Sequence, residues 1–176
     1  MKFSRPPASE YLPYFDRYIS LVNEGNVVEV LESQAGAVRD SLAGLSETKA
    51  GFRYAPGKWS VREVIGHLID TERVFGYRAL AVARGELASL PSFDENAYAA
   101  LSRHDGCPLT GLVDEFTALR RSHVLLFRHL DDAAWERLGR VDGHPMSTRA
   151  AAYIMAGHAR HHAMIFSARY GVSITA

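Results

Sequence analysis

Apolar residues recur at helical spacing over four long stretches of this 176-residue chain, and this pattern constrains its fold more than any other feature. The apolar stripes predict amphipathic helices at about residues 26–45, 60–84, 109–130 and 147–170. Strand-like alternation of apolar and polar residues is scarce, which disfavours the sheet-based fold classes. Helices of this kind bury their apolar faces against one another, so the sequence predicts an all-α helical bundle.

The helix expected at residues 60–84 has the clearest start signal. Ser60 is placed to cap the helix, and Glu63 three residues later completes a capping box. Trp59 and Val64 lie on either side of the cap, at the spacing of a hydrophobic staple. The helix is expected to stop before Gly85, which gives it a length of about 37 Å at ~1.5 Å per residue.

Shorter helices are expected between and before the long ones. One covers about residues 9–22 and is broken near Pro13, another covers residues 131–138, and a small helix begins at Asp94. The link at residues 85–108 is long for a helical bundle. At ~3.3 Å per residue it can recross the full length of the bundle, so neighbouring helices need not alternate in direction.

The composition indicates an ordinary globular protein. Apolar residues make up 47% and charged residues 23% of the chain. We expect one domain over residues 1–176, with its core at about 26–171 and an N-terminal extension at 1–25 packed on that core. The basic and acidic residues number 20 each and no basic cluster stands out, so we expect no nucleic-acid partner. The single cysteine, the lack of a signal-like apolar core and the lack of a transmembrane-length run indicate a cytoplasmic protein without a membrane partner.

Two histidines lie one helical turn apart in the last long helix. His158 and His162 fall in the middle of its apolar stripe, where buried imidazoles are costly unless something satisfies them. A divalent metal does so directly, because histidines at positions i and i+4 converge on one point. His67, two turns into the capped helix, is the best third ligand; hydrogen-bonded core histidines are the alternative. Three protein ligands with an open position are typical of catalytic metal sites.

Other polar residues have alternative roles. Glu72 lies within its helix's apolar stripe and is either an acid–base group beside the metal or the partner of an arginine such as Arg120 in a buried ion pair. His161, at the edge of its stripe, faces solvent or a partner, or replaces one of its neighbours as a ligand. His123, on the inward stripe of the third long helix, is the reserve ligand. Cys107 would be a nucleophile only beside an activating base, and nothing near it in the sequence supplies one.

The link at residues 85–108 is expected to wall the metal pocket, with Phe93, Tyr98 or both facing it. Long structured connections in compact domains are often functional, and aromatic side chains give the apolar lining of small-molecule pockets. The alternative is that the two aromatic residues only pin the link to the bundle. Three further histidines are expected in loops or on the surface: His104, His129 and His144.

Two segments of the chain resemble the signatures of the DinB-like (YfiT-like) superfamily. The first is YAPGKWSVREVIGHLIDTER at residues 54–73, and the second is GHARHH at residues 157–162. Residues 10–22, and Phe116 with the arginine pair that follows it at 120–121, are also similar to this family. The resemblance therefore covers nearly the whole chain.

The resemblance implies a four-helix bundle of up-down-down-up topology with one divalent metal ion, zinc or nickel, at one end. The family's three histidine ligands carry over to His67, His158 and His162, the same three that the spacing selects. The implied function is a metal-dependent enzyme in which the ion activates water, as in a hydrolase, or a thiol, as in an S-transferase. A low-molecular-weight thiol such as mycothiol or bacillithiol is then a co-substrate, a small molecule is the substrate, and a homodimer is common. The alternative is a non-catalytic metal- or ligand-binding stress-response protein.

Overall fold

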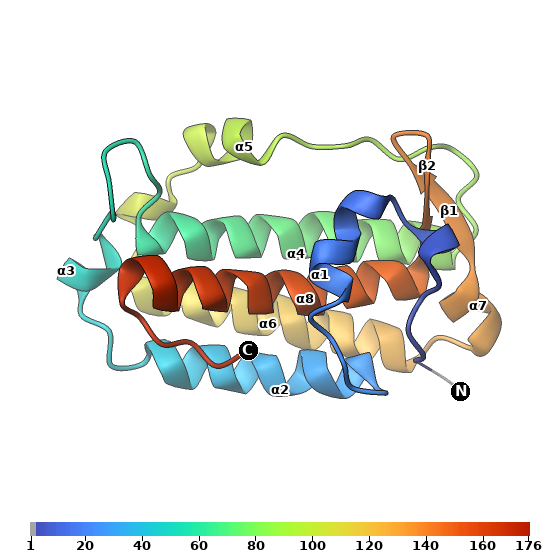
Figure 1. Ribbon diagram of the computed structural model, residues 1–176, viewed down its shortest axis with the longest axis horizontal. Helices are drawn as coiled ribbons and strands as arrows, with labels where there is room; N and C mark the ends of the chain where they lie inside the picture. Colours follow the sequence, from blue (N-terminus) through green and yellow to red (C-terminus); the bar gives the residue numbers. More distant parts are fainter. Residues whose placement is uncertain (1–2) are drawn as a thin grey trace.

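The computed structural model describes residues 3–176 and forms a bundle of four long helices (Figure 1). These helices are α2 (Val27–Leu42), α4 (Val61–Ala83), α6 (Leu109–Arg128) and α8 (Thr148–Ile165). Helices α2 and α4 each pack against both α6 and α8. In Figure 1, α2 and α8 run in one direction and α4 and α6 in the other, which confirms the up-down-down-up topology. None of the helices in the described residues combines the length and apolar character that a membrane span requires.

Short elements surround the long helices. In chain order they are η1 (Ala8–Glu10), η2 (Pro13–Phe15), α1 (Asp16–Ile19), α3 (Glu47–Ala50), α5 (Glu95–Leu101), η3 (His104–Gly106), α7 (Asp132–Glu136), β1 (Leu138–Val141), β2 (His144–Ser147) and the π-helical turn η4 (Phe166–Tyr170). The helix expected at residues 9–22 is therefore three short helical segments, of which the second and third follow one another directly. Pro13 opens the second of them, since proline lacks the N–H that a continuing helix needs and favours the first helical turn.

A β-hairpin follows α7, where the sequence predicts more helix. The helix expected at residues 131–138 ends at Glu136, and β1 and β2 then pair antiparallel. Asp142 and Gly143 form the two-residue turn with φ angles of 51° and 76°. Positive φ at both positions is typical of a type I′ turn, and an Asp-Gly pair between two short runs is its usual sequence signal. The prediction of further helix in this region was therefore wrong, although the Asp142-Gly143 pair in the sequence is a hairpin signal.

Helix α4 begins as predicted. The Ser60 Oγ accepts a hydrogen bond from the Glu63 backbone N–H (3.1 Å), and the Glu63 carboxylate accepts one from the Ser60 N–H (2.7 Å). Both halves of the capping box are thus made. Since the cap fixes the start of the helix, it also fixes the direction in which His67, two turns later, leaves the helix.

The connection from α4 to α6 recrosses the bundle from end to end, so that these two helices begin at the same end (Figure 1). Its first part is anchored on the hairpin: the Leu90 N–H donates to the Arg140 carbonyl and the Asp142 N–H donates to the Leu90 carbonyl, both at 2.9 Å. Asp94 caps α5 by accepting hydrogen bonds from two backbone amides of its first turn, as predicted. Helix α5 then packs against α4.

A buried polar layer divides the apolar core into two clusters, one toward each end of the bundle. Arg120 of α6 donates to both carboxylate oxygens of Glu72 on α4, at 2.5 and 3.0 Å. It also donates to the side-chain oxygen of Gln34 on α2 (2.5 Å), and Gln34 donates to the Ala156 carbonyl on α8 (2.9 Å). The layer therefore joins all four long helices at mid-length.

Candidate metal centre

Three histidines from two helices meet at the wall of a cavity, and we call them the histidine cluster: His67 on α4, and His158 and His162 on consecutive turns of α8. The Nε2 atom of His158 lies 3.1 Å from the Nε2 atoms of both His67 and His162. The three candidate ligand atoms all lie within 4.8 Å of one another. The residues are 9%, 6% and 8% exposed, respectively. The structure thus brings together the three residues that the sequence predicts as ligands.

Hydrogen bonding alone does not satisfy this cluster. In a neutral imidazole the Nε2 atom has either one N–H or one lone pair, so Nε2 of His158 can make a well-directed hydrogen bond to one of its two close neighbours and not to both. The other contact then brings two like atoms together. A divalent ion removes this conflict, because all three lone pairs can point at it. Nitrogen ligands ~2.0–2.1 Å from a tetrahedral zinc ion lie about 3.3–3.4 Å apart. The two separations from His158 are close to this value, and the third pair lies within 4.8 Å.

Burial keeps these imidazoles neutral. It lowers the pKa of His67 to about 4, with a smaller contribution from His161. The pKa values of His158 and His162 also fall well below the usual value, first because of burial and then because of the neighbouring imidazoles. Neutral imidazole is the form that binds a metal ion. At neutral pH the cluster is therefore in its ligand form.

Trp59 fixes the ring of His67 from one side. The two ring centroids are 5.1 Å apart with the planes inclined at 41°. Tyr170, in the turn that ends the last helix, donates a hydrogen bond from its hydroxyl to the Trp59 carbonyl (2.7 Å). Trp59 directly precedes the Ser60 cap of α4, so the start of α4 is tied to the turn that follows α8. Both helices that carry the cluster are thereby held together beside it.

The N-terminal segment covers the other side of the cluster. The Tyr18 ring contacts His158 edge-on, with centroids 5.2 Å apart, and lies 5.3 Å from the ring of His161. Gly157 permits this approach, because a Cβ there would lie 2.0 Å from the Tyr18 carbonyl oxygen. Arg160 donates to the Leu21 carbonyl (2.8 Å) and holds the same segment on α8. The N-terminal segment at residues 12–21 therefore contributes to the site, which the sequence did not indicate.

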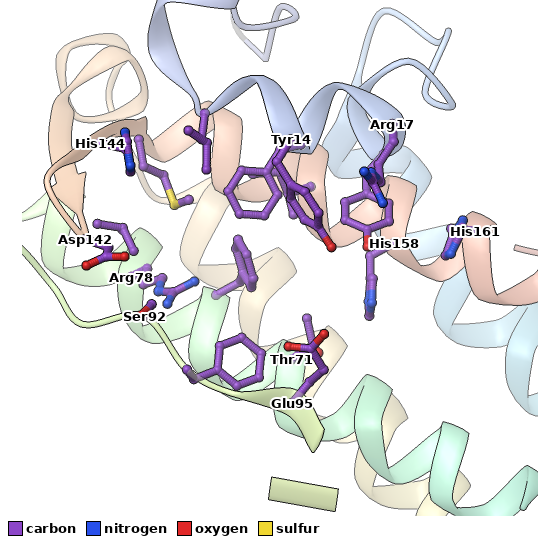
Figure 2. Close-up of a pocket in the computed structure, with 18 of the residues that line it drawn as sticks. Tyr14, Arg17, Thr71, Arg78, Ser92, Glu95, Asp142, His144, His158 and His161 are labelled. Carbon is purple, nitrogen blue, oxygen red and sulfur yellow. The ribbon is translucent and has the colours of Figure 1, made fainter. Parts of the chain in front are cut away.

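The cluster opens onto a cavity of about 470 Å³ that combines apolar walls with a few charged groups (Figure 2). Its lining comes from the N-terminal segment, α4, the crossover, the hairpin and α8. Besides the cluster, the polar and aromatic lining residues include Tyr14, Phe15, Arg17, Tyr18, Trp59, Thr71, Phe75, Arg78, Phe93, Glu95, Asp142, His144 and His161. Most of these come from segments remote in sequence, so the apolar periodicity of single helices does not predict that they share one cavity.

The predicted pocket residues are divided between two places. His161 and Phe93 line this cavity. Tyr98 instead lines a smaller neighbouring pocket, with its ring 5.4 Å from that of Phe93. His144, expected only on the surface, is exposed but also lines the main cavity. His104 packs over Gly66 of α4, where a Cβ would lie 2.1 Å from its ring.

Glu72 and His123 belong to the polar layer and not to the lining of the cavity. Besides its two bonds from Arg120, the Glu72 carboxylate lies 3.2 Å from the Nδ1 atom of His123. Burial raises the pKa of Glu72, but Arg120 and His123 together hold it below the ordinary value. A buried carboxylate neutralised in this way is not available for acid–base work in the cavity. The structure therefore shows the ion-pair alternative for Glu72, and His123 is that carboxylate's neighbour instead of a reserve ligand.

The comparisons with known proteins agree with this architecture. A family model of the DinB superfamily matches residues 31–165, so the chain belongs to the DinB superfamily. It is 24% identical over 131 residues to "Putative metal-dependent hydrolase YfiT" of Bacillus subtilis (strain 168), which covers 74% of this chain and 72% of that protein. Among solved structures, it matches one described as "YfiT from Bacillus subtilis is a probable metal-dependent hydrolase with an unusual four-helix bundle topology". The TM-score is 0.74 at 20% identity, over 97% of this chain and 95% of that one. These matches confirm the family resemblance and the predicted fold.

Proposed function

We propose that this protein is a metal-dependent enzyme whose divalent ion, zinc or nickel, is held by His67, His158 and His162. The observation that carries the proposal is the convergence of three neutral, buried imidazoles at the wall of a cavity. The metal dependence in the printed name of the YfiT relative points the same way. Within the described residues no fourth histidine, cysteine or carboxylate joins the cluster. The donor set thus suits a three-ligand catalytic site that keeps a position for a reactant.

When bound, such an ion lowers the pKa of a water or thiol and makes its anion available near neutral pH. The protein groups around it bind and position the reactants. Thr71, one turn after His67, is buried with a hydroxyl that has no partner among residues 3–176, and it lines the cavity. Glu95 turns its carboxylate into the cavity beside Thr71 (Figure 2). We assign Glu95 as the acceptor of the nucleophile's proton, and Thr71 as a hydrogen-bonding partner of the substrate.

The open side of the cluster favours the enzyme over the non-catalytic alternative. A metal- or ligand-storage module needs no access for a second reactant and is expected to close its coordination with protein atoms. Here all three histidines line a cavity that also holds charged and apolar side chains. Two nucleophiles, water and a low-molecular-weight thiol, are compatible with this arrangement. We propose the hydrolase as the first candidate because of the relative's name, and the thiol S-transferase as the second because of the family resemblance.

Elemental analysis of protein purified without a metal-affinity column tests the ion directly, and the expected result is about one zinc or nickel per chain. Activity is then measured in two reactions. The first is hydrolysis of 4-nitrophenyl esters, and the second is transfer of cysteine, glutathione, bacillithiol or mycothiol to monochlorobimane. The Glu95→Gln variant should lose activity while retaining the ion. Metal-loaded protein without either activity would favour the non-catalytic alternative.

We also propose that the protein is a cytoplasmic homodimer, which the resemblance and the composition indicate. Several large apolar side chains on the outer faces of the long helices are exposed, among them Tyr77, Leu80, Leu125 and Met164. A second chain packed helix against helix would cover some of them. Light scattering at micromolar concentration is expected to give the mass of a dimer, and a monomer mass would refute this part of the proposal.

A further inference from the structure

Arg78 is a buried cation that faces the cavity without an acidic partner. The residue is 4% exposed, and Figure 2 shows its guanidinium directed into the cavity. Among residues 3–176 its one hydrogen bond runs to the Pro91 carbonyl at 2.8 Å, and it takes part in no ion pair. A guanidinium has five N–H donors, so most of its donor capacity is left for another partner.

The surroundings of Arg78 are apolar. Its guanidinium carbon lies 4.9 Å from the centroid of the Phe75 ring and 5.6 Å from that of Phe93. Burial lowers its pKa, which the neighbouring Tyr98 phenol offsets only in part. A charged guanidinium between two aromatic rings is poorly solvated, and it gains most from a partner of opposite charge.

Two other arginines, one fully buried and one partly buried, show what such a partner does. Arg120 is fully buried and makes two hydrogen bonds to Glu72. Arg149 is paired in the same two-pronged way with Glu10. In both cases a carboxylate of the protein matches the planar fork of the guanidinium. At Arg78 that position is open to the cavity, so a carboxylate from outside the chain can take it.

Arg78 also lies in line with the histidine cluster. His67 and Arg78 are separated by eleven residues on α4, which is three helical turns with only ~20° of rotation, and about 16 Å of axial rise. Thr71, with its unused hydroxyl, lies between them on the same face. One wall of the cavity thus presents an imidazole of the cluster, a free hydroxyl and a free guanidinium in sequence.

We propose that Arg78 is a carboxylate-binding subsite, and that the substrate is an elongated, largely apolar monocarboxylate with its reactive end at the histidine cluster. This inference rests on the proposed function. The body of such a molecule would lie against Phe75, Ile154 and other apolar parts of the lining. Arg78 is the one buried guanidinium among the described lining residues, in a cavity that also contains Glu95 and Asp142, and this suits one negative charge better than the two of a phosphate group.

The test compares 4-phenylbutyrate with its uncharged amide, 4-phenylbutyramide, by titration calorimetry on the full chain. Both are measured with zinc bound and after removal of metal with EDTA. We expect wild-type protein to bind the acid about tenfold or more tightly than the amide in both states, because a charge-assisted bidentate contact is lost with the amide. Arg78→Met should abolish this preference. Arg78→Lys should keep part of it and serves as the second variant, since it retains charge without the planar fork.

Arg17→Met is the matched control. Arg17 lines the same cavity but is exposed, so its removal changes the charge of the region without touching the subsite. The proposal requires that this variant keep the preference for the acid. A merely structural role for Arg78, holding the crossover at Pro91, would instead weaken binding of acid and amide equally in Arg78→Met and would overturn the proposal.

Other outcomes separate this inference from the proposed function. The preference for the acid over the amide can disappear when the metal is removed and survive in zinc-bound Arg78→Met. In that case the carboxylate binds the ion, so the subsite is refuted while the metal site stands. Equal affinity of wild-type protein for acid and amide also refutes the subsite. If the preference persists in protein that binds no metal under any condition, the subsite is supported and the metalloenzyme is not.

Discussion

Two polar clusters lie inside the same bundle, five residues apart on α4, and they are built on opposite principles. In the polar layer of Gln34, Glu72, Arg120 and His123, donors and acceptors match, and hydrogen bonds reach all four long helices. In the histidine cluster like atoms face one another, and the Nδ1 atom of His162 is buried without a partner among the described residues. The first cluster is complete in the protein alone, whereas the second requires something from outside.

This difference separates a structural site from a functional one more reliably than burial does. Both clusters are nearly inaccessible to solvent, and both contain ionisable groups. A closed network rigidifies the bundle and leaves no atom for a ligand. A cluster whose buried polar atoms lack partners destabilises the protein by itself, and a bound ligand or ion supplies the missing partners. Four experiments test this contrast.

The largest effect is expected from Arg120→Met, which removes the centre of the polar layer. The substitution leaves the Glu72 carboxylate buried without its counter-charge, and such changes cost about 3–5 kcal/mol. We expect the free energy of unfolding, measured by urea denaturation, to fall by this amount. The control is Arg128→Met, which removes the exposed ion pair with Glu32 and should cost less than about 1 kcal/mol. Similar losses in the two variants would mean that the polar layer is not a stabilising unit.

His158→Ala tests the open cluster, and its main effect should appear in metal binding. His158 lies between the other two ligands, so its loss should weaken zinc binding about a hundredfold or more. Removal of a residue that only hydrogen-bonds to a ligand typically weakens metal binding by about 10- to 100-fold, and loss of a ligand itself should cost more. The metal-free variant should lose less stability than Arg120→Met, because the substitution also removes a contact between like atoms. Chelator competition gives the affinity, with His129→Ala, an exposed histidine, as control. Full metal occupancy in His158→Ala would refute the proposed site.

Glu72 in the polar layer should be protonated in the folded protein at a lower pH than an unperturbed carboxylate. Burial raises the pKa of Glu72, but Arg120 and His123 outweigh it, so the folded-state pKa lies below the usual 4.5. A carboxyl whose pKa is depressed in the folded state adds stability that is present above pH 4.5 and is lost as the pH falls through the folded-state value. Unfolding free energies measured from pH 7 to pH 3 should therefore decline below about 4.5. In Glu72→Gln this part of the decline should be absent; an unchanged profile would contradict the assignment.

The sequence predicted what depends on local periodicity and missed what depends on distant partners. Helical spacing gave the four long helices, and the i to i+4 relation gave His158 and His162. The capping box placed His67. For Glu72, by contrast, the sequence is compatible with two roles, because its partner Arg120 lies 48 residues away and only packing selects it.

The other omissions have the same cause. Tyr18 belongs to a segment without strong helical periodicity, and it reaches the cluster only through the close approach at Gly157. Arg78 has no distinguishing signal in the sequence, because a charged residue beside an apolar stripe ordinarily reaches solvent. Only the crossover at Pro91, to which it is hydrogen-bonded, accounts for its burial. The hairpin is a different case, since its Asp142-Gly143 turn was readable from the sequence alone.

The smallest effect is expected from Tyr98→Ala, which sharpens the contrast at the edge of the open region. Phe93 lines the main cavity, whereas Tyr98 is 48% exposed, lines the smaller neighbouring pocket and contacts the Phe93 ring. Removal of an edge-on ring contact at an exposed position costs about 1 kcal/mol, so the melting temperature should fall by only a few degrees. Affinity for 4-phenylbutyrate should stay within about twofold of the parent, since this ring does not line the cavity.

Phe93→Ala is the matched variant and should weaken 4-phenylbutyrate binding several-fold, because it removes both part of the cavity wall and a ring beside Arg78. The two variants together decide what the crossover does. If only Phe93→Ala changes affinity, the crossover contributes one lining residue and Tyr98 merely supports it. If Tyr98→Ala weakens binding as strongly as Phe93→Ala, the two rings act as one unit and Tyr98 belongs to the ligand-binding site.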